Sequence, residues 1–217
     1  GSELGGEAPN HYTFDETAEK VKEQDIFIPR YFWPPLVQDL ASPAGRNVKW
    51  KSLNDLIAEG ALITRAGHGS PQSHFKGKGN YPYIRVKDII NWEIYRDPTA
   101  LIPQSEFEKL TKKFPLDFED VVYVSRGSYR IGDVAIVGPD DRDVALTREI
   151  QVLRVCKNNT SGLTPYYLLY LLSTQVVAQQ TKARVFLDTT LPTISDRYLG
   201  IKLPWDVDSE VRAEISE

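Results

Sequence analysis

Two glycine-containing segments gather the side chains best suited to binding a polyanion. The first, Arg65–Asn80, mixes glycine with serine, glutamine, histidine and lysine. The amide of Gln72 could read adenine bidentately, and the guanidinium of Arg65 could read guanine. Lysine acts as a point charge that suits phosphates, so Lys76 and Lys78 are expected at a nucleic-acid backbone. The alternative is a disordered surface loop.

The second segment is Arg126–Gly132, with the sequence Arg-Gly-Ser-Tyr-Arg-Ile-Gly. It places two arginines, Arg126 and Arg130, on a turn bounded by glycines. The planar fork of arginine suits base edges, although a plain hairpin turn would have the same sequence pattern. Because both segments combine basic groups with amides or hydroxyls, together they predict binding of DNA with sequence readout.

The distribution of charge points to a polyanionic ligand in the middle of the chain. The formal net charge is −4, with −5 on residues 1–25 and −4 on residues 205–217, so residues 26–204 carry +5. Residues 65–87 hold five basic residues and no acid, which is an electrostatic footprint for a polyanion or else a solvated basic face. The candidate DNA-binding residues are Arg65, His68, Ser70, Gln72, Ser73, Lys76, Lys78, Arg85, Lys87, Arg126, Ser128, Tyr129, Arg130 and Arg184.

No catalytic site is predicted. A methyltransferase needs a glycine-rich loop that opens a helix to hold its cofactor, and the sequence has no such motif. Asn80–Tyr83 resembles the Asn-Pro-Pro-Tyr motif of adenine-N6 methylases, but Tyr81 stands where the first proline belongs. Glu106–Lys109 supplies only half of a nuclease motif, and Asp140–Asp143 is predicted to be a hairpin turn.

Neither a cofactor nor a metal is expected. The single cysteine, Cys156, lies in an apolar stretch, where we predict a buried, unreactive thiol. The histidines His11, His68 and His74 lack ligand spacing. The longest apolar run, Tyr166–Leu172, is far short of the roughly 20 residues that a membrane span needs. Without a signal-peptide pattern, the expected location is the cytoplasm.

The ends of the chain differ from its middle. It begins Gly1-Ser2 and contains no methionine, which indicates an expression scar followed by a piece of a longer protein. Four parts are expected: an acidic flexible lead-in at 1–25, an extended proline- and aromatic-rich strap at 26–47, a folded domain at 48–204 and the start of a helix at 205–217.

Three helices and several short strands are predicted within the folded domain. The helices run from Ser52 to Gly60, from a Ser105–Glu108 cap to before Pro115, and from Thr164 to about Lys182. The third is apolar nearly all round near its start and should be largely buried. The strands are predicted at Ala61–Arg65, Tyr83–Ile90, Trp92–Tyr95, Val121–Ser125, Val134–Val137, Val144–Thr147, Ile150–Cys156 and Gly200–Leu203. The fold class is α+β, with a curved mixed or antiparallel sheet and a few packed helices.

Taken in order, these segments resemble the target-recognition domain of type I restriction–modification specificity subunits. The resemblance covers roughly residues 48–204 and is carried by Tyr81–Ile89, Asp120–Gly132, Tyr166–Leu172, Leu191–Ser195 and Ile201–Pro204. It implies a non-catalytic module that reads one half of a split DNA target and directs an adenine-N6 methyltransferase or endonuclease to it.

The resemblance also implies partners. These are double-stranded DNA, a DNA methyltransferase subunit or domain, and either a second recognition domain or a second copy of the chain. In the family a long helix sets the spacing to the second half-site reader and docks on the methylase, and Asp208–Glu217 looks like its beginning. The same domain occurs behind adenine-N6 methylases, and Ile26–Tyr31 is similar to the stretch that joins the two there.

A second hypothesis belongs to another class of protein. The apolar strap and the helix beginning at Asp208 could make the chain a docking module for a catalytic partner, with only incidental DNA contact. The basic span 65–87 favours DNA recognition over docking.

Overall fold

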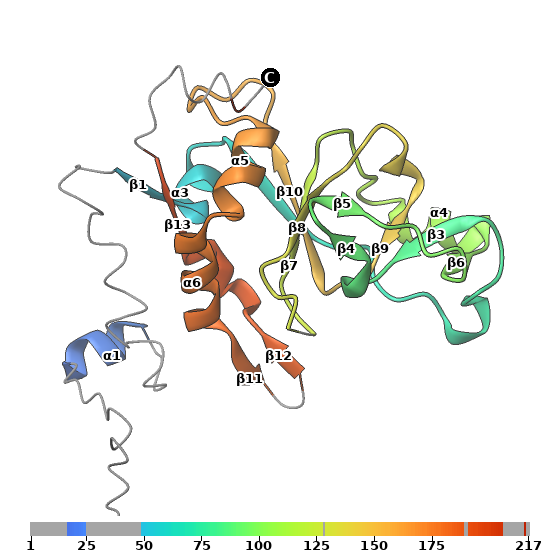
Figure 1. Ribbon diagram of the computed structural model, residues 1–217, viewed down its shortest axis with the longest axis horizontal. Coiled ribbons are helices and arrows are strands. Elements are labelled where there is room, and N and C mark those ends of the chain that lie inside the picture. Colours follow the sequence, from blue (N-terminus) through green and yellow to red (C-terminus); the bar gives the residue numbers. More distant parts are fainter. Residues whose placement is uncertain (1–16, 25–48, 128, 189–190, 206–214, 216–217) are drawn as a thin grey trace, which may run out of the picture.

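The computed structural model describes residues 17–24, 49–127, 129–188, 191–205 and 215. The predicted strap at 26–47 and the helix predicted from Asp208 lie outside the described residues. Within the predicted flexible lead-in, Ala18–Gln24 forms a helix, α1 (Figure 1). An acid in its first turn, Glu19, and a base in its last, Lys22, match the helix dipole.

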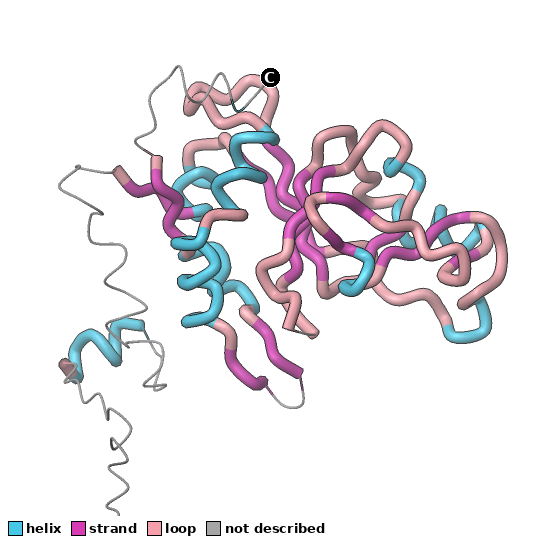
Figure 2. The backbone as a smooth tube through the Cα atoms, viewed as in Figure 1, coloured by secondary structure: helices cyan, strands magenta, loops and turns pink. Residues whose placement is uncertain are grey.

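A four-stranded antiparallel sheet forms the centre of the fold. Its strands lie in the order β2 (Leu62–Ala66), β10 (Ile150–Val155), β7 (Val121–Val124) and β8 (Val134–Ile136). Figure 2 shows these strands between a group of helices and a second lobe made largely of strands and loops.

Both faces of this sheet are buried. Successive side chains of a strand point to opposite faces. On β7, Val121 and Tyr123 therefore belong to one hydrophobic core, whereas Val122 and Val124 belong to another. All four side chains are fully buried. This double burial explains why β7 is uninterruptedly apolar, without the alternation of a strand that faces water on one side.

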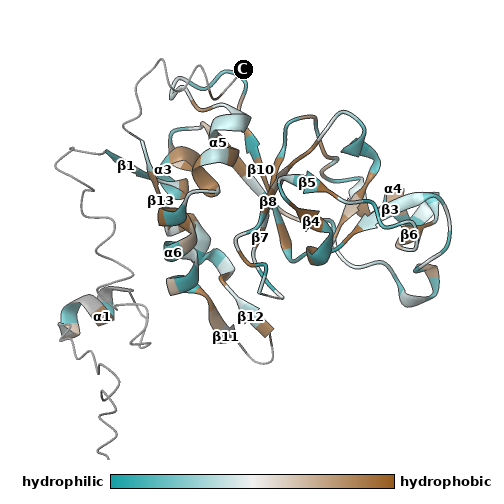
Figure 3. Ribbon diagram, in the orientation of Figure 1, coloured by the Kyte–Doolittle hydropathy of each residue, from teal (hydrophilic) through white to brown (hydrophobic). Residues whose placement is uncertain are grey.

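Helices cover the face of the sheet to which Val121 and Tyr123 point. The elements there are α3 (Leu53–Ala58), α5 (Pro165–Leu172), α6 (Gln175–Arg184), the 3-10 helix η7 (Ser195–Gly200) and the pair β1 (Trp50–Ser52) and β13 (Lys202–Pro204). The predicted capping box of α3 is confirmed, since Ser52 Oγ accepts from Asp55 N and the Asp55 carboxylate accepts from Ser52 N. Figure 3 shows hydrophobic stretches on α3 and β13, where they border this core.

The second core lies beneath the other lobe. This lobe contains β3 (Tyr81–Ile84), β4 (Ile89–Ile90), β5 (Glu93–Ile94), β6 (Leu101–Ile102), α4 (Gln104–Thr111), β9 (Ala145–Leu146) and the 3-10 turns η4 (Ser73–Phe75), η5 (Val86–Asp88) and η6 (Asp141–Asp143). A separate hairpin joins β11 (Phe186–Asp188) to β12 (Leu191–Thr193). The pairing of β3 with β6 is antiparallel, but its pairing with β9 is parallel. The prediction of an α+β fold with mixed and antiparallel sheets is confirmed.

The strand predicted at Tyr83–Ile90 is wrong as a single element. The chain leaves β3 after Ile84, turns through η5 and resumes as β4. The turn forms because the buried carboxylate of Asp88 accepts hydrogen bonds from both the backbone N and the Nε of Arg85. A local side-chain bond of this kind competes with the strand ladder.

The helix predicted from Thr164 to Lys182 is two helices. Its start is confirmed, because Thr164 Oγ1 accepts from Tyr167 N. It breaks after α5, where Ser173 Oγ donates to the Leu169 carbonyl and Thr174 takes an extended conformation at the cap of α6. Hydroxyls that bond to carbonyls one turn back weaken a helix at that point.

Three smaller predictions are also corrected. The residue at the cap of α4 is Pro103, so Ser105 lies inside the helix. Asp140–Asp143 contains a 3-10 turn but no hairpin, because β8 pairs with β7 whereas β9 pairs with β3. Cys156 is half-buried and follows the last residue of β10, so it is neither fully buried nor in the strand.

Gly67, directly after β2, lies close against the backbone that connects β9 to β10. A Cβ added there would lie 2.9 Å from the Thr147 carbonyl carbon and 3.0 Å from Ile150 O. We expect Gly67→Ala to lower the free energy of unfolding by about 1–3 kcal/mol, because backbone atoms on both sides would have to move. Urea denaturation measures the loss. Gly200→Ala is the control, since nothing lies within 4 Å of its added Cβ. Equal stability of the two variants would contradict this packing.

Candidate nucleic-acid interface

The turn between β7 and β8 is held at both of its ends. Gly132 N donates to Val124 O, and Gly127 N donates to Pro192 O of the β11–β12 hairpin. Both glycines have positive φ, +100° at Gly127 and +103° at Gly132, which explains their place in the sequence. A Cβ on Gly132 would also lie 3.1 Å from the Thr181 methyl of α6. Both ends of the turn are therefore anchored to the rest of the fold.

Arg126 is the arginine of this turn that has no carboxylate partner. Its backbone bridges to Thr193, its side chain is half-buried, and its Nε is buried without a hydrogen-bond partner among the described residues. It forms no ion pair with any described residue. Without a carboxylate partner, the rest of this guanidinium keeps donors that an external acceptor could use, whereas the buried Nε is out of reach of a ligand.

Arg130 has contacts within the fold. Its Nη1 lies 3.0 Å from Asp133 Oδ2 and donates to Ile89 O at 3.0 Å. The carboxylate of Asp133 raises the pKa of the Arg130 guanidinium. The ring of Tyr129 lies 5.7 Å from the guanidinium and is 92% exposed. Ser128 lies outside the described residues. Of the predicted turn residues that the structure describes, Tyr129 is thus the most accessible and Arg130 the most tightly held.

His68 fastens the start of the first loop. Its Nδ1 accepts from Leu146 N at 2.9 Å, and its Nε2 lies 2.8 Å from Phe114 O, so the ring is neutral with its proton on Nε2. Burial lowers the pKa of this imidazole. The contacts give His68 a structural role, whereas the side chains of Ser70, Gln72 and Ser73 in the same loop are exposed.

Lys76 and Lys78 extend from a loop whose backbone is anchored. Gly77 N and Lys78 N both donate to Leu101 O of β6, and Gln72 N donates to the buried carboxylate of Glu106. Both lysine side chains are exposed and form no ion pair with described residues. The loop is therefore better fixed than its glycine content predicts, and its two free cations lie at the surface.

The basic cluster at 65–87 is partly neutralised by two acids outside it. Arg85 forms ion pairs with Asp88 at 2.9 Å and with Asp97 at 2.6 Å, and Lys87 lies 3.4 Å from the same Asp97 carboxylate. Hydrogen bonds from Thr99 and the nearby cations hold the pKa of Asp97 well below its usual range. Arg85 is thus committed to the fold, whereas Lys87 remains largely exposed.

Two further predicted residues lie apart from these loops. Arg65, on β2, is exposed and contacts only its neighbour's carbonyl, with Nη1 3.4 Å from Thr64 O. Arg184, at the end of α6, donates to Gln180 O and Gly200 O, which ties α6 to η7. The structure therefore gives Arg184 a role in packing.

Sequence reasoning missed three polar residues near the turn. Arg148 is exposed in the connection that leads into β10, Gln151 donates from Nε2 to Ser125 Oγ at 3.0 Å, and Lys182 is exposed on α6. Because β10 pairs with β7 from Ile150 opposite Val124, Arg148 and Gln151 reach the end of the sheet where the turn begins. For Arg148 and Gln151, the pairing of β10 with β7 is the information that the sequence lacked, since nothing in their local sequence distinguishes them.

Three segments that carry or adjoin candidate residues extend to the same side of the molecule. The β7–β8 turn, the β11–β12 hairpin and the loop that carries η4 all extend toward the lower edge in Figure 1. Arg126, Tyr129 and Arg148 come from the sheet end, whereas Lys76 and Lys78 come from the other lobe. This arrangement could contact one extended polyanion at two places.

Two other kinds of site were sought within the described part of the chain. None of its helices is both long and apolar enough to cross a membrane. It also holds no group of three or more histidine, cysteine or carboxylate side chains placed to bind a metal ion.

The fold and this surface define a class of protein: a compact α+β module whose exposed cations and hydroxyls suit a nucleic acid. A family model described as "Type I restriction modification DNA specificity domain" matches residues 47–204. The chain belongs to that family, whose members recognise DNA target half-sites and are not catalytic. Specificity subunits of type I systems bind DNA and assemble with methylase subunits.

Comparison with solved structures finds similar chains. The S subunit of a type I restriction–modification system from M. genitalium aligns with a TM-score of 0.50 and 14% identity, over 81% of this chain and 39% of that one. The HsdS subunit from Thermoanaerobacter tengcongensis aligns with a TM-score of 0.49 and 14% identity, over 92% and 43%. A chain from a study of complex assembly in the type I system aligns with a TM-score of 0.48 and 18% identity, over 91% of this chain and 46% of that one. This chain thus spans less than half of each, and no curated protein matches it.

The contacts of His68 predict a pH dependence of stability. The pKa of its imidazole is lower in the folded chain than in the unfolded chain, so stability is complete above about pH 6.5 and is lost as the pH falls through the lower folded value. We expect the free energy of unfolding to fall between pH 7.5 and 5.5, by at most about 1.4 kcal/mol per pH unit.

Urea denaturation at the two pH values measures this loss. His68→Gln should be less stable at pH 7.5 and should show a smaller change with pH. His74→Gln is the control, because the His74 side chain is exposed and should leave the pH dependence intact. A pH dependence that survives in His68→Gln would assign it to other groups.

Proposed function

We propose that this chain reads one half of a split double-stranded DNA target and directs an adenine-N6 DNA methyltransferase, as a subunit or as a fused domain, to that target. The observation that carries the proposal is Arg126, which lies half-buried on a turn anchored at both ends and has no carboxylate partner among the described residues. Arginine in a fixed orientation suits the edge of guanine.

The residues near the β7–β8 turn and the lysines of the other lobe have different roles in this proposal. Arg126 and Tyr129 belong to the turn between β7 and β8, and Gln151 contacts Ser125 at the start of that turn, so a base edge could be read there. Lys76 and Lys78 offer exposed charges on the other lobe and suit phosphates. Arg65, Ser70, Gln72, Ser73, Lys87 and Arg148 extend this surface. The contacts of His68, Arg85 and Arg184 favour a supporting role, and Arg130 combines support with a position at the turn.

The rest of the proposal concerns assembly. The recognition domain occupies residues 48–204, and a second recognition domain or a second copy of the chain reads the other half-site, in the cytoplasm. The family match favours this function over a docking module with incidental DNA contact. The strap at 26–47 and the segment from Asp208, on which the docking hypothesis rests, lie outside the described residues.

Removing Arg126 should reduce specificity. We expect Arg126→Ala to lose about 1–3 kcal/mol of discrimination between the selected half-site and its single-base variants, because a bidentate contact to one base is lost. Arg130→Ala should lose a similar amount if its guanidinium exchanges Asp133 for a base. The half-site is first selected from a randomised duplex pool, and competition binding then measures each variant.

The control carries the same change of charge elsewhere. Arg142→Ala removes an exposed arginine from η6 and should keep full discrimination. If Arg126→Ala discriminates as well as Arg142→Ala does, the β7–β8 turn is only a hairpin and the readout lies elsewhere.

Removing Lys76 or Lys78 should weaken binding to all sequences alike. Each lysine neutralises one phosphate in this proposal, so each alanine variant should lower the slope of log affinity against log salt by about one. Fluorescence anisotropy across a salt series measures the slope. Lys157→Ala, an exposed lysine in the connection between β10 and α5, should leave it unchanged. A slope unaffected in both loop variants would remove this loop from the interface.

A further inference from the structure

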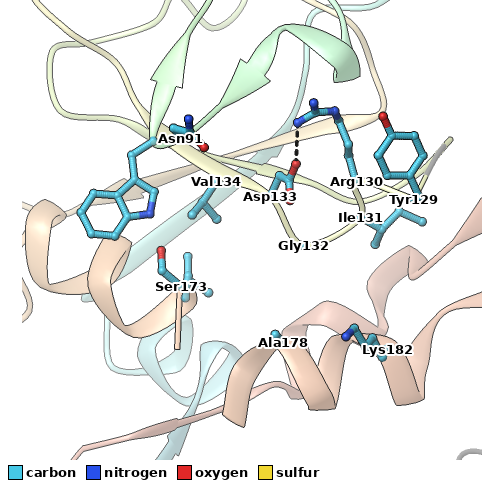
Figure 4. Close-up of a pocket in the computed structure, with 12 residues that line it drawn as sticks. Asn91, Tyr129, Arg130, Ile131, Gly132, Asp133, Val134, Ser173, Ala178 and Lys182 are labelled. Atoms are coloured by element: carbon cyan, nitrogen blue, oxygen red, sulfur yellow. Dashed lines mark hydrogen bonds and ion pairs between the residues drawn. The ribbon is translucent and has the colours of Figure 1, made fainter. Parts of the chain in front are cut away.

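A pocket adjoins the β7–β8 turn, and the DNA contacts proposed above make no use of it. It has a volume of about 380 Å³ and lies between the β4–β5 turn, the β7–β8 turn and the α5–α6 helices. Its polar and aromatic lining consists of Asn91, Trp92, Tyr129, Arg130, Asp133, Ser173 and Lys182. Figure 4 shows Tyr129 and Arg130 beside one another on one wall, and Lys182 on the helix across from them.

Trp92 has an unusual backbone for a large residue. Ile90 pairs with Glu93, so Asn91 and Trp92 form a two-residue turn in which both have positive φ, 51° and 69°. Such turns favour glycine at the second position, because a Cβ is strained there. Ile136 N donates to Trp92 O at 3.0 Å and fixes the turn. These backbone contacts hold Trp92 in its strained conformation, and its side chain is 48% exposed, so part of the indole is accessible to a ligand.

The other side of the pocket adds a second accessible aromatic ring. Tyr129 is 92% exposed, and its backbone belongs to the glycine-bounded turn that is tied to β12. Flat aromatic surfaces held on rigid turns can stack on bases without regard to sequence, since every base has a π-face. A volume of about 380 Å³ is in the range of small-ligand pockets and is ample for one base.

The charge of the lining favours an anionic ligand. Asp133 is the only carboxylate among the lining residues, and it is already paired with Arg130. Lys182 is exposed and forms no ion pair with the described residues. The pocket thus carries a net positive charge, which suits a phosphate next to a stacked base better than a basic or neutral peptide.

We propose that this pocket accepts one unstacked nucleotide of the bound DNA. The base stacks on Trp92 and Tyr129, Asn91 and Ser173 face its polar edge, and Lys182 contacts the adjacent phosphate. This inference rests on the proposed DNA-binding function. The proposed function concerns contacts with paired bases, whereas this inference adds a contact with one nucleotide outside the base stack.

The experiment compares two duplexes that differ by one unpaired nucleotide. Binding of the 217-residue chain is measured by fluorescence anisotropy to a fully paired duplex and to the same duplex with a single-nucleotide bulge, over a series of salt concentrations. The bulge removes most of the cost of unstacking. We expect the bulged duplex to bind about tenfold more tightly, in the range of one base–aromatic stack.

Two variants make the test specific. Trp92→Gly should abolish the preference for the bulge, and its melting temperature should be unchanged or higher, because glycine suits the positive φ at this position. Tyr95→Ala removes an aromatic residue that is 55% exposed and outside the pocket, and it should keep the preference. Loss of the preference in folded Trp92→Gly but not in Tyr95→Ala supports the proposal.

Three results would overturn it. Equal affinity of the unmodified chain for the two duplexes, with a steep salt dependence for both, would reject the nucleotide pocket and leave the proposed DNA binding intact. A preference retained in Trp92→Gly would place the bulge elsewhere on the protein. No binding of either duplex would reject the proposed function and this inference together, and would make a protein interface the better explanation of the exposed tryptophan.

Discussion

Burial of the central sheet on both faces is the constraint on which the rest of the structure depends. Strand β7 alternates its side chains between two cores, so the helical side and the second lobe are both packed against the same four strands. Val122 and Tyr123, adjacent in sequence, anchor opposite layers. Because interiors are close-packed, neither layer can shift without disturbing the strand that they share. The end of this sheet is therefore a rigid platform for the turn that carries Arg126.

Buried polar groups inside the fold hold its loops in place. The buried carboxylate of Asp88 closes the turn between β3 and β4, and that of Glu106 holds the loop before η4. Asp120 is buried too, and it pairs with Arg154 through two contacts of 2.7 Å. A buried carboxylate is tolerated only with such partners, and its partners are then fixed in turn. The loop that carries Lys76 and Lys78 consequently offers exposed side chains on an anchored backbone, which lowers the entropy lost when a ligand binds.

Hydrogen-bond partners also distinguish residues that support the fold from residues that we propose contact DNA. His68 and Arg184 have side chains that satisfy backbone groups within the fold, whereas Lys76 and Arg126 leave their charge without a partner among the described residues. Residue type alone does not make this distinction, since all four are basic or can be. What distinguishes them is whether a carbonyl, an amide or a carboxylate lies within hydrogen-bond distance.

The sequence by itself determined the α+β class, the capping box at Ser52, the helix start at Thr164 and the glycine-bounded turn, because each depends on residues within a few positions of one another. Only the tertiary structure decided which cations remain free. Asp97, outside the basic run, reaches Arg85 and Lys87, and the pairing of β10 with β7 brings Arg148 to the turn. Local spacing cannot reveal such contacts, since they depend on where distant strands pair, and that is set by burial of the whole sheet.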